Sequence, residues 1–126
     1  MPAPLGAIGW VDLTVEDATT VSQFYRTVCD WSVEPVDMRG YSDYVMNNSA
    51  GTAVAGVCHA RGPNADIPPQ WLMYVSVADV AKSVAAARAS GGRILREPTS
   101  IGGYGTMAVI QDPAGAVIGI IQPPPG

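Results

Sequence analysis

Histidine, cysteine and charged residues are scarce in this sequence: its 126 residues include one histidine, two cysteines and only 14% charged side chains. Hydrophobic residues make up 48% of the chain, which is too high a share for a disordered protein. No apolar run reaches the length that a bilayer requires, so we expect no membrane partner. The composition is that of a soluble protein with enough residues to bury a core.

A targeting segment and a basic surface are also missing. The first ten residues, MPAPLGAIGW, lack the cationic segment and apolar stretch of a cleaved signal, so we expect a cytoplasmic protein. The net charge is −4 and the seven basic residues are scattered, which excludes the basic stripe that a nucleic-acid partner requires. In a reducing compartment we expect Cys29 and Cys58 to be buried and unpaired.

The chain contains one pattern twice. The segment VED that starts at Val15 matches VAD at Val77, an offset of 62 residues, and AGTAVAGV from Ala50 matches AGAVIGII from Ala114, an offset of 64. A module of about 55 residues would be only marginally stable alone, so we expect the two to share one core in a single domain covering the whole chain, 1–126. The expected division is module one at about 7–60, a Pro-rich linker at 61–69 and module two at about 70–122.

Each module opens with alternating apolar side chains, which predict a strand whose aliphatic face packs under a helix. Asp17 and Asp79 follow at helix N-cap positions and predict helices at about 18–28 and 80–89. The apolar stripe of the first helix is expected to be Val21, Phe24, Tyr25 and Val28. Three strands are expected after each helix, at 32–36, 43–48, 53–60, 92–98, 105–111 and 116–122. The predicted fold class is α+β, with two β-α-β-β-β modules.

Four features in this order are similar to the vicinal oxygen chelate superfamily: V-x-D before the helix, Phe24-Tyr25 within it, Trp31 after it, and the turn Asp112–Gly115 before the last strand. This family includes glyoxalase I, extradiol dioxygenases, fosfomycin-resistance enzymes and bleomycin-resistance proteins. The resemblance covers residues 7–122 and implies a curved eight-stranded sheet around a cleft, with the helices on the outer face. It also implies a homodimer.

The resemblance further implies four metal-ligand positions, with His or Gln on the opening strand of a module and Glu on its closing strand. Counting from the repeated motifs places Trp10, Leu72, Ala55 and Gly119 at these positions. None of these side chains can replace the water shell of a divalent cation. We therefore expect no metal and no other cofactor.

Strand alternation assigns side chains to the cleft, provided that no bulge shifts the register. The expected cleft lining is Trp10, Asp12, Thr14, Leu72, Tyr74, Ser76, Ala53, Ala55, Val57, Val117, Gly119 and Ile121. This lining is mostly apolar with a few polar points, which is typical of a small-molecule site.

The candidate catalytic residues are Asp12 and His59. An apolar cleft would raise the pKa of the Asp12 carboxyl and make it a general acid or base, although a carboxylate held by a neighbouring strand is the simpler interpretation. His59 shares the alternation of Ala55 and Val57, which places it at the rim of the cleft unless it is a surface or packed residue. The candidate substrate-binding residues are Trp10, Asp12, Tyr44, Leu72, Tyr74 and Tyr104, the last in a glycine-rich loop, SIGGYGT, expected over the cleft.

Two functions are compatible with these residues. The first is metal-independent binding of a small aromatic or hydrophobic molecule in the cleft, as in bleomycin-resistance proteins. The alternative is an enzyme of the same superfamily, of the lyase, isomerase or dioxygenase type, that uses an acid or base residue or an unrecognised metal site.

Overall fold

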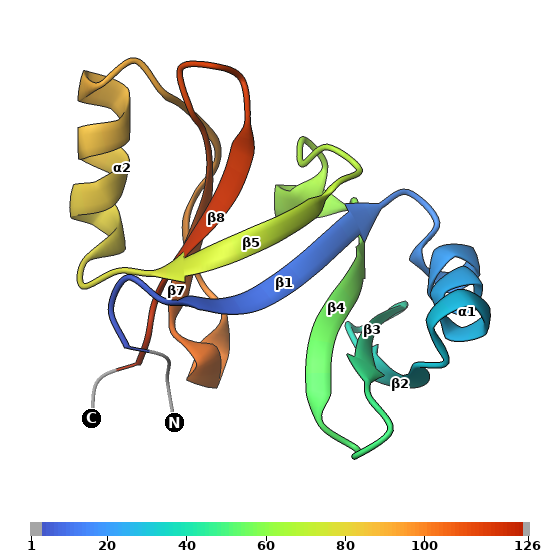
Figure 1. Ribbon diagram of the computed structural model, residues 1–126. Coiled ribbons are helices and arrows are strands. Elements are labelled where there is room, and N and C mark those ends of the chain that lie inside the picture. Colours follow the sequence, from blue (N-terminus) through green and yellow to red (C-terminus); the bar gives the residue numbers. More distant parts are fainter. Residues whose placement is uncertain (1–3, 125–126) are drawn as a thin grey trace. The chain divides into compact units, whose positions relative to one another are not determined.

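The computed structural model describes residues 4–124 (Figure 1). Contacts within the chain divide it into two units. The first-module unit comprises Val11–Trp71, and the second-module unit comprises the described residues up to Trp10 together with those from Leu72 onward. The linker therefore groups with the first module. That the two modules form one domain with a shared core stays a prediction.

The first-module unit follows the expected order of one strand, one helix and three strands. Its elements are β1 (Ile8–Val15), which belongs to this unit from Val11 onward, α1 (Ala18–Cys29), β2 (Ser32–Asp37), β3 (Ser42–Asn47) and β4 (Ala53–His59). The strands are hydrogen-bonded in the order β2-β3-β4-β1. β1 runs parallel to β4, whereas β3 is antiparallel to both of its neighbours. A short 3₁₀ turn, Gly62–Asn64, lies in the linker.

The second-module unit repeats this order. Its elements are β5 (Trp71–Ser76), α2 (Val80–Ala89), β6 (Arg93–Ser100), β7 (Thr106–Gln111) and β8 (Val117–Gln122). The strand order is β5-β8-β7-β6, with β5 parallel to β8. The start of the chain lies beside β5, because the Gly6 N–H donates to the Ser76 carbonyl (2.7 Å) and the Ser76 N–H donates to the Ala7 carbonyl (3.0 Å). The predicted α+β fold class, with two modules and eight strands, is confirmed.

Both helices begin at the aspartates expected from the sequence. The Thr20 N–H donates to Asp17 Oδ1 and the Lys82 N–H donates to Asp79 Oδ1, each at 3.1 Å. The bond from the Thr20 backbone is the main cause that lowers the pKa of the Asp17 carboxyl from its ordinary value of 3.8. α1 ends at Asp30, which adopts the left-handed conformation (φ 57°) that often ends a helix.

The stripe through which α1 packs differs from the expected one. Buried Ala18 and partly buried Val21 and Tyr25 contact the core cluster of this unit. Phe24 and Val28 are 57% and 62% exposed, so their assignment to the core was wrong. The buried stripe begins one turn earlier, at Ala18, because a small side chain lets the first turn lie close to the sheet. The sequence pattern does not distinguish such an alanine from a surface one.

A β-bulge in β4 reverses the faces of its residues. Met46 pairs with Ala55 whereas Asn47 pairs with Ala53, so Val54 is an extra residue without a partner. Beyond the bulge the alternation is opposite to the expected one. Ala55 and Val57 pack in the cluster with Ala18 of α1, so their assignment to the cleft lining was wrong.

The pairing of β7 with β8 contains no bulge. It is regular from the pair Gln111–Val117 to the pair Thr106–Gln122. The turns that precede β4 and β8 are also equivalent. Asn48 Oδ1 accepts from two backbone N–H groups at 3.0 Å, and Asp112 Oδ1 accepts from the corresponding two at 2.8 and 3.0 Å. The single inserted residue therefore lies within the strand and not in its turn.

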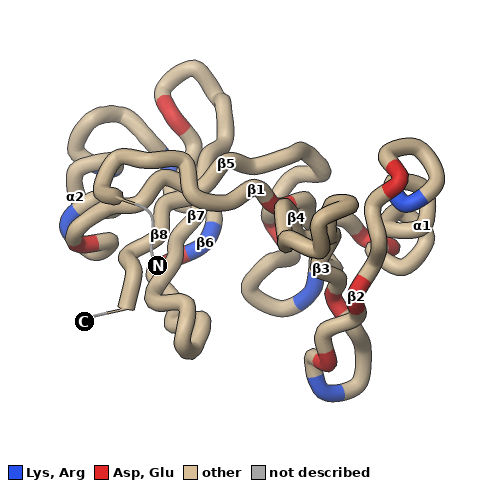
Figure 2. The backbone as a smooth tube through the Cα atoms, turned by 60° about the horizontal axis from the view of Figure 1, so that its bottom comes forward, with Lys and Arg blue, Asp and Glu red and all other residues tan. Residues whose placement is uncertain are grey.

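None of the helices in residues 4–124 is long and apolar enough to cross a membrane. Figure 2 shows the basic positions separated from one another along the described chain, as the sequence indicated. Cys29 and Cys58 are unpaired, as expected. Cys58 is partly buried, but Cys29 is exposed near the end of α1, so its predicted burial was wrong.

Candidate functional site

The bulge changes which closing-strand residue corresponds to a metal-ligand position. Asp12 pairs with Gly56 in the first module, just as Tyr74 pairs with Gly119 in the second. Gly56, and not Ala55, is therefore the structural equivalent of Gly119. Both closing-strand positions lack a side chain.

The donor set does not fit a divalent cation. The opening-strand positions hold Trp10 and Leu72, and the closing-strand positions hold glycines, so none of the four supplies an imidazole, amide or carboxylate. Among residues 4–124, no three His, Cys, Asp or Glu side chains are grouped so that they could hold a metal ion.

In the second-module unit, the face of the sheet that α2 does not cover is apolar. Val80 and Val84 of α2 pack with Ala108 and Ile120, so the neighbouring strand residues point to the other face. This helix-free face is formed by Leu72, Tyr74, Ser76, Met107, Val109, Gly119 and Ile121. Strand alternation predicted five of these residues there, namely Leu72, Tyr74, Ser76, Gly119 and Ile121, whereas Met107 and Val109 were not among the predicted residues.

Tyr74 lies directly over Gly119. A Cβ atom built on Gly119 would lie 2.3 Å from two carbons of the Tyr74 ring, a distance that real contacts do not show. The glycine therefore makes room for the aromatic ring. Tyr74 and Leu72 are both almost completely buried.

The helix-free face of the first-module unit is polar by comparison. Asp12 pairs with Gly56 and Thr14 pairs with Cys58, so these residues share a face opposite to Leu13 and Val57. The Cys58 thiol can donate to Asp12 Oδ2 at 3.9 Å.

Asp43 and His59 form the best-defined pair of titratable groups in this unit. Asp43 Oδ1 accepts from the His59 backbone N–H at 2.8 Å and lies 3.3 Å from His59 Nδ1. The two side chains are only 14% and 11% exposed, for His59 and Asp43 respectively. A carboxylate at Nδ1 favours the tautomer with its hydrogen on Nδ1, which leaves the Nε2 lone pair as a base.

Aromatic rings border His59. The Tyr41 ring meets the imidazole edge to face with centroids 5.5 Å apart, and the Tyr44 ring lies at 6.4 Å. The Arg61 guanidinium carbon lies 4.0 Å from the centre of the Tyr41 ring. The Tyr44 hydroxyl is 2.7 Å from Thr19 Oγ1 of α1, which fixes the ring on the helix-covered face.

The Cys58 thiol is not a nucleophile in this environment. The pKa of the Cys58 thiol is raised far above its usual range. Burial is the largest cause, and the nearby carboxylates of Asp12 and Asp43 raise it further. The protonated thiol therefore acts as a hydrogen-bond donor between two acidic groups.

We expect iodoacetamide to distinguish the two cysteines at mildly alkaline pH. Exposed Cys29 should be alkylated, whereas Cys58 should stay unmodified because almost no thiolate forms there. Mass spectrometry of the native protein should show a single adduct, and the denatured protein should show both. A Cys29→Ser variant that still gained an adduct under native conditions would contradict this environment for Cys58.

The predicted site residues separate into two groups. Asp12, Tyr44 and His59 belong to the first-module unit, and Trp10, Leu72, Tyr74 and Tyr104 belong to the second-module unit. Within the first group, Asp12 contacts Cys58 on the helix-free face, whereas Tyr44 neighbours His59. Tyr104 lies in the 3₁₀ turn Gly102–Tyr104 and is 78% exposed, and Trp10 is half-buried.

Sequence reasoning missed Asp43 and Thr19. Asp43 stands at the start of β3, and nothing in its neighbourhood along the chain marks it as the partner of His59, 16 residues away. The pairing of β3 with β4 brings the two together. An acidic side chain near the start of a strand with an apolar centre, Tyr44–Met46, was the only available signal.

Comparisons with known proteins give one consistent family. The family model described as Glyoxalase/Bleomycin resistance protein/Dioxygenase superfamily matches residues 7–120. CFP32 of Mycobacterium tuberculosis, a glyoxylase by name, is 33% identical over 121 residues, which are 93% of this chain and 46% of CFP32. The anthracycline biosynthesis protein DnrV of Streptomyces peucetius is 29% identical over 127 residues, covering 91% of this chain and 46% of DnrV. The chain thus spans about half the length of these curated relatives.

Solved structures share the fold at lower identity. A variant of methylmalonyl-CoA epimerase from Streptomyces coelicolor, in complex with 2-nitronate-propionyl-CoA, superposes with a TM-score of 0.58 at 17% identity. The match covers 97% of this chain and 100% of that one. With the module order, the strand pairing and the family model in agreement, the chain belongs to the Glyoxalase/Bleomycin resistance protein/Dioxygenase superfamily.

Proposed function

We propose that this chain binds a small aromatic or hydrophobic molecule without a metal ion. The observation that carries the proposal is the replacement of metal ligands by Trp10, Leu72 and two glycines. The apolar helix-free face of the second-module unit supports it, because Tyr74 and Leu72 offer aromatic and aliphatic contact area there. The name of DnrV is also consistent with it, since anthracyclines are polycyclic aromatic compounds.

Binding requires that buried side chains of this face become accessible to the ligand. Leu72 and Tyr74 are almost inaccessible without ligand, and so binding includes the cost of exposing them. A planar ring system would replace the contacts that these side chains lose. We also propose that the protein is a homodimer, as the resemblance implied, and that it is located in the cytoplasm.

Ligand-dependent melting of metal-free protein tests the binding function. A water-soluble anthraquinone and a naphthol should each raise Tm by about 10 °C at 100 times Kd, because binding to the folded state alone stabilises it by about 2.7 kcal/mol. The shift should be the same after treatment with EDTA, and short aliphatic acids should give none. Loss of the shift after EDTA, or its recovery only with added metal, would refute metal independence.

Two matched tyrosine variants test whether the ligand binds on the helix-free face of the second-module unit. Tyr74→Leu removes the aromatic ring from the helix-free face and should weaken binding of the anthraquinone, whereas Tyr41→Leu removes a ring from the other unit and should not. The Tm of each variant without ligand serves as its own baseline. Equal loss in both variants would argue against Tyr74 as a contact residue.

The pair of Asp43 and His59 favours a second candidate, an enzyme that transfers a proton without a metal. His59 Nε2 would be the base, and Asp43 would position the imidazole through Nδ1. His59→Gln should then abolish turnover of an identified substrate while its binding persists, and Asp43→Asn should shift the pH profile of the reaction. If Asp12→Asn abolishes turnover and His59→Gln does not, Asp12 is the base instead.

A further inference from the structure

The two modules end their helices with equivalent arginines that have different partners. Arg26 in α1 and Arg88 in α2 are 62 residues apart, the same offset that relates the N-cap residues Asp17 and Asp79. In the second-module unit, the guanidinium of Arg88 forms an ion pair with Glu97 of β6. That arginine is therefore neutralised within its own module.

Strand pairing identifies the corresponding position in the first module. Glu34 of β2 pairs with Val45, as Arg96 of β6 pairs with Val109. The next residue along each edge strand is Pro35 in the first module and Glu97 in the second. A proline thus stands where the other module has the acid that neutralises its arginine.

Arg26 has no such counter-ion in the described part of the chain. Its Nη1 donates to Gln23 Oε1 at 3.3 Å, one turn earlier in α1, and no carboxylate there lies within ion-pair distance of it. The amide holds the guanidinium in place without neutralising it. The positive charge is therefore available to a ligand.

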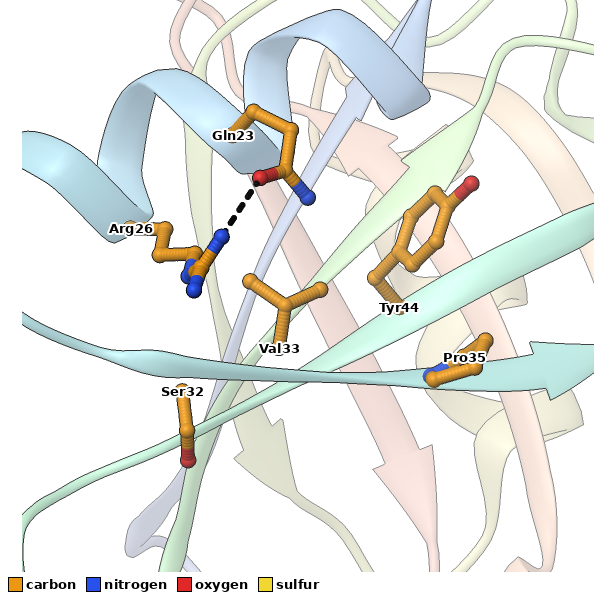
Figure 3. A pocket seen from close by; sticks show the side chains of 6 residues that line it. All are labelled: Gln23, Arg26, Ser32, Val33, Pro35 and Tyr44. Atoms are coloured by element: carbon orange, nitrogen blue, oxygen red, sulfur yellow. Dashed lines mark hydrogen bonds between the residues drawn. The ribbon is translucent and has the colours of Figure 1, made fainter.

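This arginine lines a pocket between α1 and the strands β2 and β3. The pocket has a volume of about 370 Å³ and is lined by Gln23, Arg26, Ser32, Val33, Pro35 and Tyr44. Figure 3 shows Gln23 and Arg26 extending from the helix toward β2, with Val33 below Gln23, between Arg26 and the Tyr44 ring. None of the lining side chains is acidic, and the floor is apolar.

We infer that this pocket binds a small aromatic carboxylate. The Arg26 guanidinium would pair with the carboxylate through two N–H groups, and the ring would lie against Val33, Pro35 and Tyr44. The volume suits a single substituted ring. The site is distinct from the helix-free faces, because its residues lie on the side of the first-module sheet that α1 covers.

Titration with benzoate, followed by the backbone amide signals in two-dimensional NMR, tests this site. Benzoate should shift the amides of Gln23, Val33 and Tyr44 saturably, with a Kd of about 1 mM, as expected for one charge pair and one ring contact. Benzamide, which has the same ring without the charge, should shift them only weakly. Saturable shifts confined to the helix-free faces would overturn the inference.

Three variants test whether benzoate binding requires the unneutralised positive charge of Arg26 in this pocket. Arg26→Gln should weaken benzoate binding by about tenfold, because it removes the charged partner of the carboxylate. Pro35→Glu should weaken it as strongly, because it supplies the acid that the second module has. Arg88→Gln, the matched control, should leave the affinity unchanged.

Benzoate binding in this pocket and ligand binding on the helix-free faces use different residues, so each can fail without the other. Equal affinity for benzoate and benzamide, no effect of Arg26→Gln, or an equal loss in Arg88→Gln would each overturn the inference. The same spectra show whether every variant is folded.

Discussion

Replacing Gly119 by alanine is expected to lower the free energy of unfolding by about 2–3 kcal/mol, the upper part of the range for an overpacked core position. The new Cβ would lie 2.3 Å from the Tyr74 ring, and the ring is almost completely buried. Tyr74 therefore has no free space to move into. The strand would have to shift, and its pairing with β5 at Tyr74 would be strained.

Urea unfolding of single and double variants measures this effect. In a Tyr74→Ala background the same substitution at Gly119 should cost only a few tenths of a kcal/mol, since the clash is gone. Gly103→Ala is the control, because a Cβ there has no atom within 4 Å. An equal cost with and without the Tyr74 ring would show that Gly119 is needed for another reason.

Replacing Met46 by alanine is expected to destabilise the protein by about 3 kcal/mol, within the range of about 2–5 kcal/mol for a buried methionine. Met46 is 0% exposed and packs in the cluster with Ala18, Ala55 and Val57. Two of these neighbours are alanines, whose side chains are too short to fill the cavity that the substitution leaves. The lost contacts are therefore only partly recovered.

The measurement is again the free energy of unfolding, with an exposed methionine as control. Met38→Ala should change it by less than about 0.5 kcal/mol, because Met38 is 41% exposed. Met46→Leu, which keeps most of the volume, should cost less than about 1.5 kcal/mol. A loss in Met46→Ala no larger than in Met38→Ala would show that the cluster around Met46 does not stabilise the unit.

The elements that the sequence predicted correctly depend on local signals. Strand alternation and the N-cap aspartates act within a few residues, and so both helices begin where Asp17 and Asp79 indicated. The stripe of α1 was only half right, because the pattern around Phe24 and Val28 fits the helical period without revealing which face the sheet covers. That choice depends on tertiary packing.

The candidate site was harder to predict, because it depends on pairing between strands. Alternation placed Tyr74 and Gly119 on the correct face, since β8 has no bulge. It placed Ala55 and Val57 on the wrong one, since Val54 interrupts β4. The partnership of Asp43 with His59 requires the β3–β4 register, which no single segment of the sequence contains.

The extra residue in β4 has an evolutionary consequence. A one-codon insertion in the middle of a strand exchanges the inward and outward side chains beyond it, without a change in the turn. The first half of the gene could in this way acquire Cys58 on one side and Val57 on the other in a single event. An alignment of the two halves at one constant offset therefore pairs side chains beyond the bulge that lie on opposite faces of the sheet.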